Sequence, residues 1–283
     1  MTASRNVVRL ITVLLFALAM IASAQTKSQP KKAASKKAAA AEQAPPALEP
    51  KAIEILKATS AKLAAAKTVS FNAIELFESA SRQAHPLAYT TKYEVKMSRP
   101  NKLRVINAGD GPASEFYYDG KTIMAYAPAE DLLAVADAPP TIDATLEAIY
   151  HDIGTYFPFT DLLVSDPYKD MQPGLELAYY IGQSQVVGGI TTDIVAYVDG
   201  GVFIQAWIGA EDKLPRMVRA VYVDDPLQLR HELQISDWQL DSGLSDDTFA
   251  TAKSATAKRI KFEHPHPQPP PPAAAKPKPT KAN

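Results

Sequence analysis

The chain has 283 residues, of which 46% are hydrophobic and 22% are charged, and its formal net charge is −1. These values are typical of a globular protein and exclude a wholly disordered chain. The near-zero charge gives no overall preference for nucleic acid. The sequence contains no cysteine, which excludes disulfides and thiol chemistry, so the fold must be stabilised by core burial.

Residues 1–24 have the organisation of a signal peptide. Arg5 and Arg9 form a basic region, an apolar run extends from residue 10 to residue 21, and Ala22-Ser23-Ala24 supplies the small residues of a cleavage site. The apolar run is shorter than the roughly 20 residues that span a bilayer. Because no cysteine follows Ala24, the sequence predicts a soluble periplasmic or secreted protein and not a lipoprotein.

Two segments are predicted to be disordered: a Lys/Ala/Pro-rich linker at residues 25–49 and a Pro/Lys-rich tail at residues 263–283. Neither carries enough large apolar side chains to offset the entropy of ordering. Their lysines allow two interpretations, a solubilising linker or peripheral contact with an anionic envelope surface. The lysines concerned are Lys27, Lys31, Lys32, Lys36, Lys37, Lys276, Lys278 and Lys281.

The remaining residues, 50–262, are expected to form one domain that begins with a helix at Pro50. Alternating apolar residues then predict successive strands, and Asp119-Gly120 between two such strands is a strong hairpin signal. Helices are expected at about 141–151, with Thr141 as the N-cap, and at 160–164. Five further strands are predicted between about 175 and 239.

Short turns between sequential strands favour an antiparallel meander. The predicted fold class is therefore α+β, an antiparallel curled sheet that forms an incomplete barrel with helices packed in or over its concave face.

Catalytic and metal-site signatures are absent from the sequence. It has no G-x-S-x-G, G-x-G-x-x-G, P-loop or H-E-x-x-H motif. His264 and His266 lie in the proline-rich tail, and two histidines without further ligands do not make a firm metal site. We expect no catalytic residues, no cofactor and no metal.

Several motifs resemble those of known envelope proteins. Arg99-Pro100-Asn101, the hairpin of residues 118–128 and Asp247-Thr248-Phe249 resemble, in order, motifs of the LolA/LolB-type periplasmic lipoprotein carriers. Residues 116–121, 138–143 and 161–168 look more closely like a family of predicted periplasmic proteins of unknown function, which is thought to share the same incomplete barrel.

The resemblance implies an open half-barrel with a hydrophobic cavity that helices close as a lid. It also implies that Arg99, the arginine of the R-P-N turn, bonds the lid helices, with Arg104 as a weaker candidate for contact with the lid or a ligand head group. Apolar residues on alternating strand positions are predicted to line the cavity: Tyr93, Val95, Met97, Leu103, Val105, Phe116, Tyr118, Ile123 and Trp207.

Three functions remain open at this point. The first is non-catalytic binding of an acyl chain, a lipid or a lipidated protein in the cavity. The second is an envelope interaction or sensor module with a filled core, whose partners bind to its outer surface or tails. The third, an enzyme acting on envelope components, has no motif in its favour. The oligomeric state is not indicated by the sequence.

Overall fold

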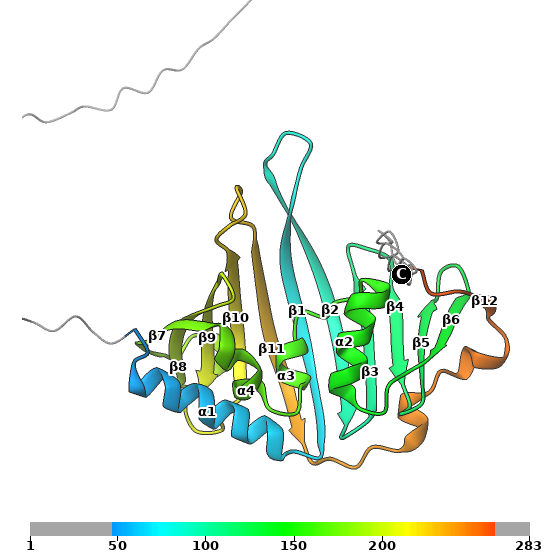
Figure 1. Ribbon diagram of the computed structural model, residues 1–283, viewed down its shortest axis with the longest axis horizontal. Coiled ribbons are helices and arrows are strands. Elements are labelled where there is room, and N and C mark those ends of the chain that lie inside the picture. The colour runs from blue at the N-terminus through cyan, green and yellow to red at the C-terminus, as the bar shows by residue number, and fades with distance from the viewer. Residues whose placement is uncertain (1–46, 264–283) are drawn as a thin grey trace, which may run out of the picture. The chain divides into compact units, whose positions relative to one another are not determined.

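The computed structural model describes residues 47–263, and these form one twelve-stranded sheet with helices along one face (Figure 1). The predicted signal peptide, the linker up to residue 46 and the tail from residue 264 lie outside the described residues. Within the described part of the chain, no helix is long and apolar enough to cross a membrane.

The helices are α1 Pro50–Ala65, α2 Ile142–Ile153, α3 Thr160–Leu163 and α4 Pro167–Met171, with short 3₁₀ turns at Gln172–Gly174, Val187–Gly189, Asp246–Phe249 and Ala252–Ala255. The strands are β1 Thr68–Ala80, β2 Pro86–Ser98, β3 Lys102–Gly109, β4 Ser114–Tyr118, β5 Thr122–Ala127, β6 Leu132–Asp137, β7 Leu175–Ser184, β8 Thr192–Asp199, β9 Val202–Gly209, β10 Pro215–Tyr222, β11 Arg230–Leu240 and β12 Lys258–Ile260.

The strand order is β12-β6-β5-β4-β3-β2-β1-β11-β10-β9-β8-β7, so β1 pairs with β2 on one side and with β11 on the other. All pairs are antiparallel except β12 with β6. The sheet therefore consists of two meanders, β2–β6 and β7–β11, which β1 joins. The sheet is curled and its ends do not pair, which confirms the predicted α+β fold with an incomplete barrel.

Local sequence explains where the main helices begin and end. Pro50 starts α1, as expected for a residue whose missing N–H costs nothing in a first turn. The Thr141 hydroxyl accepts a hydrogen bond from the Ala144 amide at 3.3 Å, which confirms the predicted N-cap of α2. Gly154 ends α2 in the left-handed conformation with φ of 72°.

The main core lies between α2 and the inner face of β1–β5, the face that the helices cover. Phe157 and Phe159, from the segment between α2 and α3, insert into it. The Phe159 ring packs edge-on against Phe71 and Tyr93, with centroids 5.4 and 5.1 Å away, and Phe157 packs against Phe116 at 5.3 Å. This half of the sheet is therefore filled by aromatic side chains.

A smaller core lies on the outer face of β3–β6. The C-terminal segment after β11 runs along the lower end of the sheet in Figure 1 and reaches the β6 edge. Tyr117, Met124 and Leu133 pack in this smaller core with Ala257, and β12 follows it to pair with β6. β12 has no signal in the sequence, because three residues with two adjacent charges show no strand periodicity. Its effect is to cover the β6 edge of the sheet, which would otherwise expose unpaired backbone groups.

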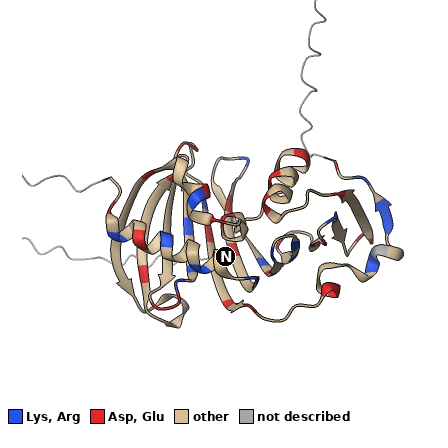
Figure 2. Ribbon diagram, turned by 60° about the horizontal axis from the view of Figure 1, so that its bottom comes forward, with Lys and Arg blue, Asp and Glu red and all other residues tan. Residues whose placement is uncertain are grey.

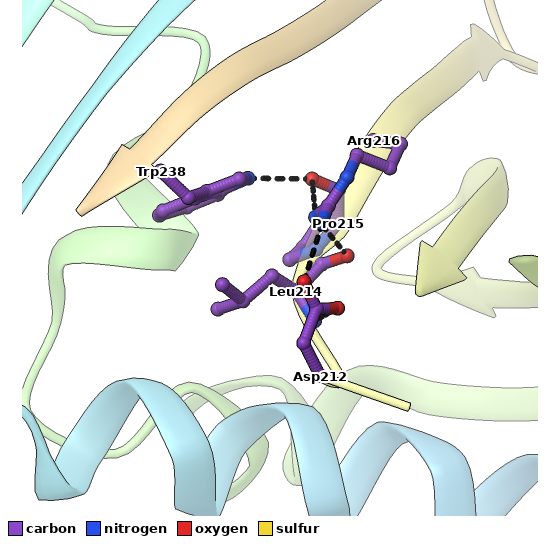
Figure 3. Close-up of polar contacts among 5 residues, drawn as sticks. All are labelled: Asp212, Leu214, Pro215, Arg216 and Trp238. Carbon is purple, nitrogen blue, oxygen red and sulfur yellow. Dashed lines mark hydrogen bonds and ion pairs between the residues drawn. The ribbon is translucent and has the colours of Figure 1, made fainter. Parts of the chain in front are cut away.

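The start of β10 is fixed to the end of β11 by a side chain (Figure 3). The Trp238 indole N–H donates to the Pro215 carbonyl oxygen at 2.8 Å. Arg216 donates to the Leu214 carbonyl at 2.9 Å and pairs with Asp212 in the preceding turn. The Trp238 ring packs on Phe71, with the ring centroids 4.6 Å apart, so this turn is connected to the main core.

Candidate functional site

A cavity of about 1050 Å³ lies on the inner face of the sheet. Its floor is formed by β1 and β8–β11, and its cover is formed by α2, the segment 155–160, α3 and α4. Ligand sites in proteins commonly enclose about 300–1000 Å³. The hollow is therefore large enough for a small molecule or a chain-like ligand.

The cavity wall is largely apolar. Inward-pointing residues of β9–β11 supply one side, because alternate residues of a strand face the same way, and α2 supplies the other. The apolar lining residues are Ala144, Leu146, Ile149, Phe157, Val164, Val202, Ile204, Val218, Ala220 and Leu233, and the aromatic residues with a hydroxyl are Tyr150, Tyr156, Tyr197 and Tyr222.

Glu75 on β1 brings a buried carboxylate to the cavity floor, with 5% of the residue exposed. It accepts a hydrogen bond from the Tyr93 hydroxyl at 3.0 Å and lies 3.2 Å from His231 Nδ1. Burial and the adjacent Glu75 charge raise the pKa of Tyr93, so the phenol stays protonated and donates. Glu75 is thus a satisfied structural carboxylate.

Three other carboxylates of the lining belong to α3, α4 and the end of β8: Asp161, Asp170 and Asp199. Part of the Asp161 side chain is exposed to solvent, and the surrounding protein partly desolvates its carboxyl group. This desolvation, together with the charges of Asp170 and Asp199, raises the pKa of Asp161 to about 6. Desolvation and the Asp170 charge also raise the pKa of Asp199. Acidic positions occur both on the helices over the sheet and on the strands behind them (Figure 2).

Side-chain hydrogen bonds hold the cover of the cavity at three places. Arg99, after β2, donates to the Leu163 and Val164 carbonyl oxygens at 3.0 Å each. Asp143 of α2 accepts from the Ser165 hydroxyl at 2.6 Å.

Further along the same segment, the Ser60 hydroxyl of α1 donates to Asp166 at 3.0 Å and accepts from the Tyr168 amide at 2.9 Å. Residues 163–168 are therefore held by side chains from three separate elements.

The structure places the predicted cavity-lining residues beside the hollow and not around it. Eight of them belong to the main core, in contact with α2 and the Phe157–Phe159 segment: Tyr93, Val95, Met97, Leu103, Val105, Phe116, Tyr118 and Ile123. The hollow lies over the other half of the sheet. Filled and hollow walls have the same alternating sequence pattern, and the difference arises from two phenylalanines in a segment that has no periodicity.

Trp207 and Arg104 lie on the outer face of the sheet, and both predictions need correction. Trp207 follows the inward-pointing Ala206, so the alternation of β9 directs it outward. Arg104 follows the buried Leu103 and bonds Glu94 at 2.7 Å, also away from the helices. Neither residue contacts the cavity or its cover.

No pattern in the sequence indicates that Asp161, Asp170 and Asp199 would line one cavity. Asp161 and Asp170 lie in short helices of four and five residues, where acidic residues are common for reasons of capping alone. Asp199 precedes the glycine turn at residues 200–201 and has the sequence context of an ordinary turn residue. Their convergence depends on long-range packing that no local pattern contains.

Comparison with known proteins gives a family and a set of similar folds. The model of a family described as predicted periplasmic protein (DUF2092) matches residues 52–263. No curated protein matches the sequence.

Three solved structures illustrate the similarity. The MucA/MucB complex of Pseudomonas aeruginosa is 14% identical, with a TM-score of 0.42 over 72% of this chain and 62% of that chain. LprF of Mycobacterium bovis is 14% identical, with a TM-score of 0.41, and the match covers 70% of this chain and 96% of LprF. A LolA superfamily protein of Nitrosomonas europaea is 11% identical, with a TM-score of 0.30, and the match covers 71% of this chain and 97% of that protein. The chain thus matches less than two thirds of the length of the first of these.

Proposed function

Since the chain belongs to the DUF2092 family of predicted periplasmic proteins, we propose that it is a non-catalytic binding protein of the periplasm. Its ligand is an acyl chain, a lipid or the acyl group of a lipidated protein, held in the cavity over β8–β11. The observation that carries the proposal is the combination of a hollow of about 1050 Å³ with an apolar wall under a helical cover.

Burial of apolar ligand surface supplies the affinity. Each Å² removed from water contributes about 25 cal/mol, so about 300 Å² of an acyl chain would contribute about 7 kcal/mol before association costs. No polar group has to react, and a cavity wall of valine, isoleucine and leucine gives little discrimination between chains of similar length.

The cavity is partly open to solvent, and movement of α2 and the segment 155–164, which lie over its floor, would widen the opening for entry and release. We propose that Arg99 holds this cover closed, because its guanidinium donates hydrogen bonds to the carbonyl oxygens of Leu163 and Val164 at the end of α3. Opening would break these bonds, and closing would restore them without a covalent step.

The alternative, an interaction module with a filled core, predicts that the hollow has no ligand. The structure contains both features, a filled half over β2–β5 and a hollow half over β8–β11. The hollow favours the binding protein, since apolar side chains that face an open space of this size are costly unless something covers them.

Native mass spectrometry of the mature protein purified from its own envelope tests the proposal. We expect a near-stoichiometric adduct that extraction identifies as acyl-containing. Ala220→Phe, which places a phenyl ring in the cavity from β10, should reduce the adduct, whereas Ala108→Phe on the exposed end of β3 should retain it. A folded protein of clean apo mass that takes up no added fatty acid, phospholipid or lipopeptide would overturn the proposal and favour the interaction module.

A further inference from the structure

The charge of the cavity is strongly one-sided. Among the described residues that line it, six are acidic and none is lysine or arginine. The acidic residues are Glu75, Asp143, Glu147, Asp161, Asp170 and Asp199. A wall with this composition repels the head group of a fatty acid and attracts a cation.

Two of these carboxylates already have partners. Glu75 is bonded to Tyr93 and lies beside His231, and Asp143 accepts from Ser165. By contrast, no ion pair between residues 47 and 263 includes Asp161, Asp170 or Asp199.

These last three residues, the acidic trio, line the same cavity from α3, α4 and the end of β8. The charges of Asp170 and Asp199 raise the pKa of Asp161, which indicates an unfavourable interaction within the trio. An uncompensated group of this kind costs stability in the free protein, so a bound cation would relieve it.

Tyr197 gives an independent indication of a ligand. Its ring is nine-tenths buried, its side chain lines the cavity two residues before Asp199, and its hydroxyl makes no hydrogen bond with any other described residue. The hydroxyl itself is reached by solvent, so it is open to a hydrogen-bonding group in the cavity. A ligand head group beside the acidic trio would provide such a group, and the tyrosine ring also attracts cations.

A metal ion does not fit this arrangement. In the part of the chain that the structure describes, no group of three histidine or acidic side chains could hold a metal ion. An ammonium group differs from a metal ion because it does not need ligands at fixed short distances and forms hydrogen bonds in several directions. The apolar wall of β9–β11 beside the trio further favours a cation joined to a hydrocarbon.

We propose that the natural ligand is an amphiphile that joins an acyl or alkyl chain to an amine head group. The head group binds at Asp161, Asp170 and Asp199 with the Tyr197 hydroxyl as an acceptor, and the chain lies along the apolar wall of β10 and β11. This inference rests on the proposed function, since it specifies the ligand of the same cavity.

Isothermal titration of the full mature protein with three probes of equal chain length tests the inference. The probes are dodecylamine, dodecanol and dodecanoate, each below its micelle concentration and at about 0.15 M salt. We expect dodecylamine to bind at least tenfold more tightly than dodecanol and dodecanoate to bind most weakly.

The variant Asp161→Asn/Asp199→Asn should bring the affinities for amine and alcohol to within about threefold of each other, a loss typical of removing two charges from one cation site. The matched control is Glu176→Gln/Glu211→Gln, which removes two exposed charges outside the cavity and should keep the preference. Ala220→Phe should weaken amine binding, which separates cavity binding from adsorption to an acidic surface.

Equal affinity for amine and alcohol, or a preference that survives the double Asp→Asn change, would overturn the amine head group and leave the proposed cavity function standing. Failure of all three probes to bind would overturn the amine head group and the proposed cavity function together. Circular dichroism of each variant verifies folding, and the Asn variants are expected to fold because each change relieves a repulsion.

Discussion

Arg99 Nη1 donates to the Leu163 carbonyl oxygen at 3.0 Å, and Nη2 of the same guanidinium donates to the Val164 carbonyl at the same distance. One side chain from the β2–β3 turn thus satisfies two carbonyls at the end of the four-residue helix α3. Burial lowers the pKa of Arg99, and the nearby Asp143 charge opposes this effect, so the guanidinium remains charged. A planar fork suits this two-carbonyl contact better than an ammonium group does.

Replacing Arg99 with leucine should loosen the cover without unfolding the sheet. Two carbonyls lose their donors, which costs about 1–3 kcal/mol. We expect faster amide exchange in residues 160–168 and a several-fold faster ligand release, measured by hydrogen exchange and stopped-flow displacement.

Arg104→Leu is the matched control, because Arg104 lies on the outer face with Glu94 as its partner. Unchanged exchange and release in a folded Arg99→Leu protein would show that this contact does not control the cover.

Phe159 should be important for stability because it fills the β2–β5 half of the sheet. The residue is 1% exposed and lies edge-on to Phe71 and Tyr93. Phe159→Ala should cost about 3–5 kcal/mol in urea unfolding, as is usual for a buried phenylalanine. Tyr156→Ala, three residues earlier and 51% exposed, should cost less than about 1 kcal/mol. A similar loss of unfolding free energy in the two variants would contradict the claim that Phe159 fills the core of this half of the sheet.

Asp161→Asn should stabilise the ligand-free protein at neutral pH. The pKa of Asp161 is raised to about 6, so between about pH 4 and pH 6 the folded state holds more protons than the unfolded state. The free energy of unfolding therefore falls as pH rises through this window. We expect a gain of about 1 kcal/mol at about pH 7.5, reduced from the full shift because water screens this partly exposed group.

At about pH 4 the same substitution should have almost no effect, because the wild-type carboxyl is then protonated in the folded state. Urea unfolding at the two pH values measures the difference. A gain of equal size at both would mean that it comes from packing and not from charge.

Amine binding should weaken as the pH falls below about 6. Asp161 faces Asp170 of α4, Asp199 of β8 and the phenols of Tyr156 and Tyr197. The pKa of Asp161 is raised to about 6, so protonation of this carboxyl below that pH removes one charge from the cation site. Dodecylamine titrations between about pH 5 and pH 8 should show an affinity that rises and then levels off. Affinity independent of pH would contradict a direct role for Asp161.

Much of the fold was predictable because it depends on local patterns. Pro50 marks the first helix, Asp119-Gly120 marks the β4–β5 turn, and the alternation of β2 shows its buried face. The elements that were missed, α4 and β12, are five and three residues long and have no internal periodicity.

The location of the hollow could not be predicted in the same way. Val105 and Val218 both point to the inner face, yet the first is buried in the main core and the second lines the cavity. What separates them is the segment 155–159, which carries Phe157 and Phe159 to one half of the sheet. That choice depends on the length of the connection after Gly154 and on packing between distant residues, neither of which has a signature in the residue pattern.

Photo-crosslinking tests the central claim most directly, because it reports which half of the sheet holds the ligand. The probe is a long-chain alkylamine with a diazirine near the end of its chain, and mass spectrometry identifies the crosslinked residues. We expect crosslinks on the cavity wall, at Ile204, Val218 or Leu233, and fewer of them in Ala220→Phe. Crosslinks concentrated on Val105 and Ile123 of the filled half, or scattered over the outer face, would contradict it.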